Sequence, residues 1–115
     1  MANDQLEQIT DVESHDAIVN KPNQAANIPM LIIVTSSTPT SASILSGIVD
    51  LSKRDEFKDV RFYEMQLTAR TTPMIKFGPQ NCPIVILMRG VYCETLLGIR
   101  SVEEVEGKVK GMVER

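Results

Sequence analysis

Residues 30–49 (MLIIVTSSTPTSASILSGIV) constrain the fold of this chain more than any other stretch. The first five are apolar without a polar break, which is typical of a strand buried on both faces of a sheet. After a turn rich in serine and threonine, apolar residues recur at spacings of one, three and four, which places an apolar stripe on a helix. A buried strand that runs through a tight turn into a helix is half of a β-α-β unit. Open α/β folds usually place their sites at such a turn.

The side chains of this turn do not suggest catalysis. The turn holds only hydroxyl groups where a catalyst would need a stronger nucleophile or a base. An activated serine requires a base within hydrogen-bond reach. The only histidine, His15, falls in a separate predicted helix near the start of the chain. We therefore expect no catalytic residue, and we treat His15 as an ordinary helix residue.

Length and charge narrow the functional class. The 115 residues suit a single domain. A net charge of −3 argues against nucleic acid or an anionic membrane as the main partner, because both favour a basic face. No apolar run approaches the ~20 residues that span a bilayer, and the polar start of the chain is no signal peptide, so we expect a cytoplasmic protein. Two cysteines and one histidine predict neither a disulfide scaffold nor a His-based metal site, and no cofactor is expected.

The rest of the chain predicts further strands and helices around the central unit. Residues 1–5 are expected to be a flexible terminus and residues 6–115 one domain. Strands are predicted at 6–9, 60–65, 83–88 and 91–97. A short helix opens at a capping box of Thr10 and Glu13, a second begins at Pro73, and a third covers 101–113. This order predicts an α/β fold with a central mixed β-sheet flanked by helices on both faces.

The order and spacing of four features resemble the thioredoxin-like family. Residues 37–40 (Ser-Thr-Pro-Thr) stand where that family has Cys-Gly-Pro-Cys, after a buried strand and at the start of a helix. Cys82–Pro83 stands where the family has its cis-proline. Arg89–Gly90 matches the hairpin turn, and Gly98 matches the glycine before the last helix. The resemblance covers residues 6–115 and implies a thioredoxin-like fold.

The resemblance also implies that redox catalysis has been lost. Ser37 and Thr40 occupy the positions of the family's two cysteines, and their hydroxyls form neither a thiolate nor a disulfide. The family's buried aspartate corresponds to Leu31, and the tryptophan before its first cysteine corresponds to Ser36. Together these departures indicate a redox-inactive member without thioredoxin-type oxidoreductase activity.

A binding surface remains once the cysteines are gone. In thioredoxin-like proteins the turn, the cis-proline loop and the segment before the last helix dock extended peptides, which requires no reactive group. We therefore expect a non-catalytic binding or assembly module whose partner is a protein, a peptide or a second copy of the chain in a dimer. The former active-site loop comprises Ser36, Ser37, Thr38, Pro39 and Thr40, and the binding surface adds Cys82, Pro83, Leu97 and Gly98.

A first alternative keeps thiol chemistry through Cys82, as a redox protein or chaperone that works with a partner's thiol. A thiol near the N-terminus of the central helix is expected to have a lowered pKa. The expected hairpin places Cys93 opposite Ile86, inside the core. Cys82 is therefore expected to react faster than Cys93.

A second alternative is a small-ligand site. The hydroxyls of residues 36–41 and the N-terminus of the helix that follows them would hold an anion, such as a carboxylate or a glutathione-like ligand. These residue types also have a plain structural explanation, since serine and threonine are common helix caps and turn formers.

Overall fold

The computed structural model describes residues 6–20, 25–68, 71 and 81–114. The terminus at residues 1–5 and the helix predicted to begin at Pro73 lie outside the described residues.

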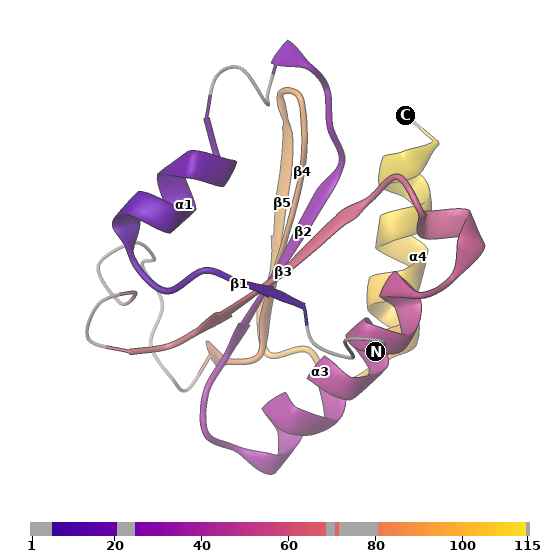
Figure 1. The fold of residues 1–115 in the computed structure, drawn as a ribbon. Coiled ribbons are helices and arrows are strands. Elements are labelled where there is room, and N and C mark those ends of the chain that lie inside the picture. Colours follow the sequence, from indigo (N-terminus) through magenta and orange to yellow (C-terminus); the bar gives the residue numbers. More distant parts are fainter. Residues whose placement is uncertain (1–5, 21–24, 69–70, 72–80, 115) are drawn as a thin grey trace.

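In the described part of the chain, a mixed sheet of five strands forms the centre, in the order β1-β3-β2-β4-β5 (Figure 1). The strands are β1 (Glu7–Gln8), β2 (Met30–Thr35), β3 (Arg61–Gln66), β4 (Ile84–Arg89) and β5 (Tyr92–Leu96). The first three run parallel, whereas β4 is antiparallel to both β2 and β5. The strand β2 lies in the middle, and all six of its residues are buried. The prediction of a central buried strand is therefore confirmed.

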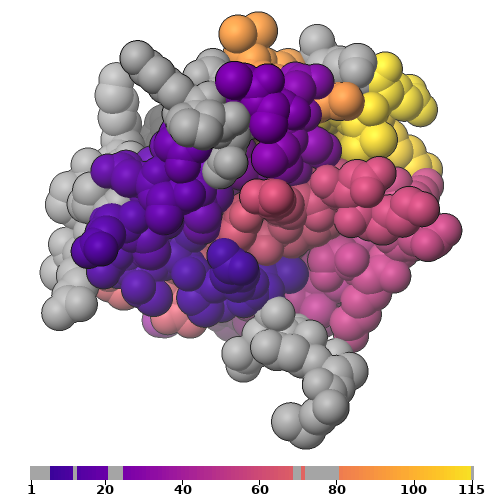
Figure 2. Space-filling view, turned by 45° about the horizontal axis from the view of Figure 1, so that its top comes forward, coloured from indigo at the N-terminus to yellow at the C-terminus, as the bar shows by residue number. Residues whose placement is uncertain are grey.

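Helices cover both faces of the sheet, as predicted. Those in the described residues are α1 (Val12–Ile18), α3 (Pro39–Ser52) and α4 (Val102–Val113), with a short 3-10 turn, η1 (Asp55–Phe57), between α3 and β3. Figure 1 shows α1 on one side of the sheet and α3 with α4 on the other. In Figure 2 the indigo N-terminal segment lies against the pink segment that contains β3, in agreement with the pairing of β1 and β3.

The core has two halves, one on each face. Successive side chains of a strand point to opposite faces. Leu31 and Ile33 therefore join the cluster under α3 and α4, while Met30, Ile32 and Val34 join the cluster on the side of α1. Because both faces are covered, the first five positions of β2 carry apolar side chains, and the last, Thr35, is buried with a hydrogen-bond partner.

The first helix begins one residue later than the sequence predicted. Its N-cap is Asp11, whose side chain accepts a hydrogen bond from the backbone N–H of Ser14 at 2.8 Å. The Ser14 hydroxyl in turn accepts one from the backbone N–H of Asp11 at 3.1 Å. The capping box predicted at Thr10 and Glu13 is therefore wrong by one position, because an aspartate is as good a cap as a threonine.

The hairpin of β4 and β5 also differs from the expected register. Arg89 pairs with Tyr92 across a two-residue turn, and Gly90 has φ +61°, as the first central position of a type II′ turn requires. Cys93 consequently lies opposite Met88, and the expected pairing with Ile86 is wrong. Alternate residues of β5 are half-buried on the side of α4, while Cys93 is exposed on the other side. The prediction that Cys93 is a core residue is therefore also wrong.

Candidate functional site

The turn rich in serine and threonine joins the carboxyl end of β2 to the first residues of α3. Thr38 is the N-cap of α3, and its hydroxyl accepts a hydrogen bond from the backbone N–H of Ser41 at 3.2 Å. Pro39 follows as the first helical residue, where its missing N–H costs nothing. The buried hydroxyl of Ser41 accepts a hydrogen bond from the backbone N–H of Ser36 at 3.2 Å. The hydroxyls of Thr38 and Ser41 therefore stabilise the conformation of the turn through hydrogen bonds to its backbone.

The loop around Pro83 is bound to the segment that precedes α4. The N–H of Gly98 donates to the carbonyl of Asn81 at 2.8 Å, and the N–H of Ile99 donates to the carbonyl of Pro83 at 3.1 Å. The peptide bond between Cys82 and Pro83 is cis. Gly98 has φ +59°, a conformation that favours glycine. These contacts bring together two segments that are about 15 residues apart in the chain.

Cys82 connects this loop to the turn, because its thiol forms a hydrogen bond with the side chain of Ser36. The structure therefore places Ser36, Cys82, Pro83 and Gly98 side by side, with Leu97 next to them in the chain. Residues 37–40 are exposed at the rim, and Ser36 and Cys82 are half-buried. Pro83 is buried, so its ring belongs to the core side of the loop.

One large apolar side chain of this surface is exposed to solvent. Among the described residues, the exposed large hydrophobic side chains are Val91, at 95%, and Leu97, at 45%. Val91 lies in the turn between β4 and β5, at the opposite end of the sheet from the loop that follows β2. Leu97 directly precedes Gly98 and so lies beside the Cys82–Pro83 loop.

The thiol of Cys82 differs from what the sequence predicted. Burial raises the pKa of Cys82, and the hydrogen bond with Ser36 lowers it by less. The expected lowering of this pKa by the N-terminus of α3 is therefore wrong. The reason is that the half-buried thiol loses more hydration than a helix terminus can replace.

We expect Cys93 to react with iodoacetamide several-fold faster than Cys82 in the folded protein, the reverse of the order predicted from the sequence. The thiolate is the reacting species, and Cys93 is exposed while burial raises the pKa of Cys82. Mass spectrometry of timed samples measures both rates, and the variants Cys82→Ser and Cys93→Ser isolate each thiol. Faster labelling of Cys82 would show that its loop opens in solution.

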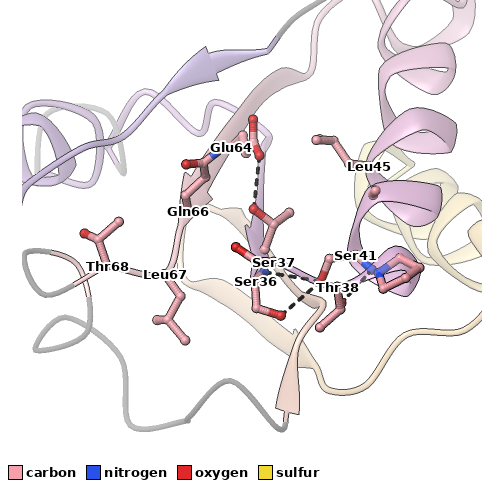
Figure 3. Close-up of a pocket in the computed structure, with 12 residues that line it drawn as sticks. Ser36, Ser37, Thr38, Ser41, Leu45, Glu64, Gln66, Leu67 and Thr68 are labelled. Atoms are coloured by element: carbon pink, nitrogen blue, oxygen red, sulfur yellow. Dashed lines mark hydrogen bonds between the residues drawn. The ribbon is translucent and has the colours of Figure 1, made fainter.

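A pocket of about 510 Å³ opens on the other side of the same turn (Figure 3). Its walls are the end of β2, the turn, the first two turns of α3 and the end of β3. The apolar side chains of Ala42, Leu45 and Leu67 line it together with several hydroxyls and the side chains of Glu64 and Gln66. We call this cavity the Glu64 pocket.

Glu64 is a site residue that the sequence analysis missed. It is 6% exposed, and the hydroxyl of Thr35 donates a hydrogen bond to its Oε2 at 3.0 Å. The side-chain amide of Gln8 donates to its Oε1 at 2.7 Å. The available signal was a carboxylate inside the otherwise apolar strand pattern Phe-Tyr-Glu-Met, since a charged residue in a buried strand usually has a specific partner.

His15, the one histidine considered as a possible base, lies away from this turn. The ring of His15 is in α1, 3.2 Å from the carboxylate of Asp16, on the opposite face of the sheet from α3. Within the described residues no group of histidine, cysteine and acidic side chains is arranged to hold a metal ion. None of the helices in the described part of the chain is long and apolar enough to cross a membrane.

Comparison with known proteins finds similarity in structure only. No family model matches the sequence, and a comparison with curated proteins finds no match either. The structure is similar to oxidised thioredoxin O1 from Arabidopsis thaliana, with a TM-score of 0.74 and 17% identity over 93% of this chain and 96% of that chain. It is similar to thioredoxin from Trypanosoma brucei brucei, with a TM-score of 0.73 and 13% identity over 96% and 93% of the two chains. It is also similar to the thioredoxin of Malassezia sympodialis, with a TM-score of 0.73 and 10% identity over 94% of this chain and 90% of that chain. The chain therefore has the thioredoxin fold over almost its whole length.

Proposed function

We propose that this protein is a non-catalytic binding module that docks an extended segment of a partner protein. The docking surface comprises residues 36–40, Cys82 with the main chain of the loop that it forms with the buried Pro83, Leu97 and Gly98. The observation that supports the proposal is the hydrogen-bonded contact between residues 81–83 and 98–99, next to which the exposed side chain of Leu97 lies in the chain. This arrangement offers an apolar anchor next to the main chain of two loops, and peptide recognition of this kind requires no reactive group.

The side chains of the turn support binding in preference to disulfide chemistry. Ser37 and Thr40 are exposed hydroxyls at the positions where the resembling family has its two cysteines. The remaining thiol, Cys82, has a raised pKa and is held by Ser36, so it is mostly a neutral thiol at neutral pH. Both observations weigh against the thiol alternative.

The anion alternative is weakened by Glu64. The pocket at the N-terminus of α3 is the place where an anion would bind, and the Glu64 carboxylate lines the same pocket. Like charges repel, and more strongly when they are partly shielded from water. The positive end of α3 therefore has a negative group beside it already.

A peptide selection tests the proposal. We expect peptides selected from a random phage-displayed library on the wild-type protein to bind Leu97→Asp roughly 30-fold more weakly, because a charge would replace an apolar anchor in a desolvated contact. Val91→Asp is the matched control, since it places the same charge on the other large apolar side chain that is exposed among the described residues, at the far end of the sheet. Affinities are measured by fluorescence polarisation with synthetic peptides, and circular dichroism checks that both variants are folded.

Two outcomes would overturn the proposal. Equal binding by Leu97→Asp and the wild type would show that this surface is not the docking site. Reduction of insulin disulfides by the wild-type protein above a control without protein would show that the site is catalytic. If the partner is a second copy of the chain, sedimentation velocity detects a dimer that Leu97→Asp dissociates and Val91→Asp does not.

A further inference from the structure

We infer that the Glu64 pocket receives the ammonium group of a lysine side chain from the bound partner. The inference rests on the proposed function, because the partner segment supplies the lysine. It adds a preference for partner segments that carry a lysine to a docking surface that otherwise recognises a segment by its shape. The residues that carry it are Glu64, its two hydrogen-bond donors and the apolar wall of α3.

Glu64 is a buried carboxylate with no cation paired to it among the described residues. Each of its oxygens accepts one hydrogen bond, from neutral donors in Thr35 and Gln8. No ion pair joins Glu64 to any residue that the structure describes, and no lysine or arginine is among the described residues that line the pocket. An ionised carboxylate has about four acceptor positions, so about two remain for a ligand. A buried charge is costly unless it is paired, and a ligand cation supplies the missing partner.

The size and the walls of the pocket suit a lysine side chain. The volume of about 510 Å³ leaves room for the whole side chain of a lysine. Figure 3 shows Glu64 on the strand side of the opening and Leu45 on the helix side. Lysine buries its apolar stem along such a wall while its charged end reaches a polar group. Leu45 and Ala42 form the wall for the stem, and the hydroxyl of Ser37 is a further acceptor at the rim.

The hydrogen bonds already made by Glu64 favour an ammonium over a guanidinium. Arginine binds carboxylates best through two parallel hydrogen bonds, one to each oxygen. Thr35 and Gln8 already occupy one position on each oxygen, so this paired approach is obstructed. An ammonium is a compact charge that needs only one free position.

The pocket is also placed correctly for a docked segment. Ser36, Ser37, Thr38 and Pro39 line the Glu64 pocket and also form the turn of the docking surface. A peptide that crosses this turn has Leu97 on one side and the opening of the pocket on the other. One of its side chains therefore reaches Glu64 while its backbone stays on the docking surface.

Small amines test the pocket without knowledge of the partner. n-Butylamine, which has the four-carbon stem and amine of a lysine side chain, is titrated at neutral pH into the isotope-labelled 115-residue protein, and amide NMR spectra follow the binding. We expect saturable shifts at residues 35–38 and 66–68, about tenfold stronger binding than with the neutral n-butanol, and weaker binding of n-propylguanidine, which carries the guanidinium and stem of an arginine side chain and no amine. Glu64→Gln, of the same size, is expected to remove the advantage over n-butanol. Asp59→Asn is the matched control, because it removes one exposed charge outside the pocket.

The outcomes of the amine titration and of the peptide selection distinguish a failure of this inference from a failure of the proposed function. Equal shifts from n-butylamine and n-butanol on the wild type, or stronger binding of butyrate, would overturn the lysine site whatever the peptide selection shows. Retention of the amine preference by Glu64→Gln would also overturn it. If Leu97→Asp leaves peptide binding intact while n-butylamine still binds through Glu64, the docking surface is wrong and the pocket is a site for a free amine. With both correct, the selected peptides are enriched in lysine at one position, and Glu64→Gln abolishes that enrichment.

Discussion

Gly47→Val is expected to lower the free energy of unfolding by about 3 kcal/mol, because it inserts a branched side chain into the contact between α3 and α4. A Cβ on Gly47 would overlap the Cγ2 methyl of Val102 and lie 3.1 Å from its Cβ. Val102 opens α4, and a β-branched side chain has little freedom to turn away. Valine is a slightly better helix former than glycine, so the whole loss comes from packing. Urea denaturation measures it, and the melting temperature should fall by roughly 10 °C.

Gly107→Ala is the control for this substitution. Gly107 lies in α4 and is exposed, and an added Cβ meets no atom within 4 Å. This variant should gain about 0.5–1 kcal/mol, because alanine loses less backbone entropy in a helix. Opposite signs for the two substitutions are therefore expected. A neutral Gly47→Val would mean that α3 and α4 move apart without cost.

Arg89→Met is expected to lower the free energy of unfolding by about 2–3 kcal/mol, because Arg89 binds the open end of α4. Its Nη1 donates to the carbonyls of Met112 and Val113, at 3.0 and 2.7 Å. These carbonyls belong to the last turn of α4, where a positive charge is favourable, and the Met112 carbonyl also accepts from the backbone N–H of the C-cap Glu114. Methionine keeps the apolar stem and removes only the charged donor. Urea denaturation gives the total loss, and amide hydrogen exchange locates it in the last turn of α4.

Arg100→Met is the matched control, because it removes the same charge from an exposed position just before α4. It should change the free energy of unfolding by less than about 0.5 kcal/mol, as surface substitutions usually do. Equal losses in the two variants would indicate an effect of net charge. Arg89→Lys is expected to recover part of the stability, since lysine keeps the charge without the forked geometry.

The main fold was predictable because its signals are local. The apolar run of β2 and the stripe of α3 report burial through periodicity, and periodicity depends only on neighbours in the chain. Thr38 and Pro39 mark the start of α3 by capping chemistry. Gly98 marks a position with positive φ before α4. Local signals lose accuracy at element ends, which is why the cap of α1 was misplaced by one residue, from Asp11 to Thr10.

The tertiary structure decided which side chains of the candidate site are buried and which partners they have. Within its own strand Glu64 stands out only as a charged residue, and it becomes a pocket residue because β1 and β2 bring Gln8 and Thr35 against it on the face that α3 leaves partly open. The environments of the two thiols depend in the same way on distant segments. Cys82 is half-buried against Ser36, and Cys93 is exposed because it faces outward on an edge strand. Within the described residues, the sequence by itself determined which segments form the main strands and helices and in which order. The packing of those elements decided which polar groups lose water and which face a cavity, because burial is a property of several segments at once.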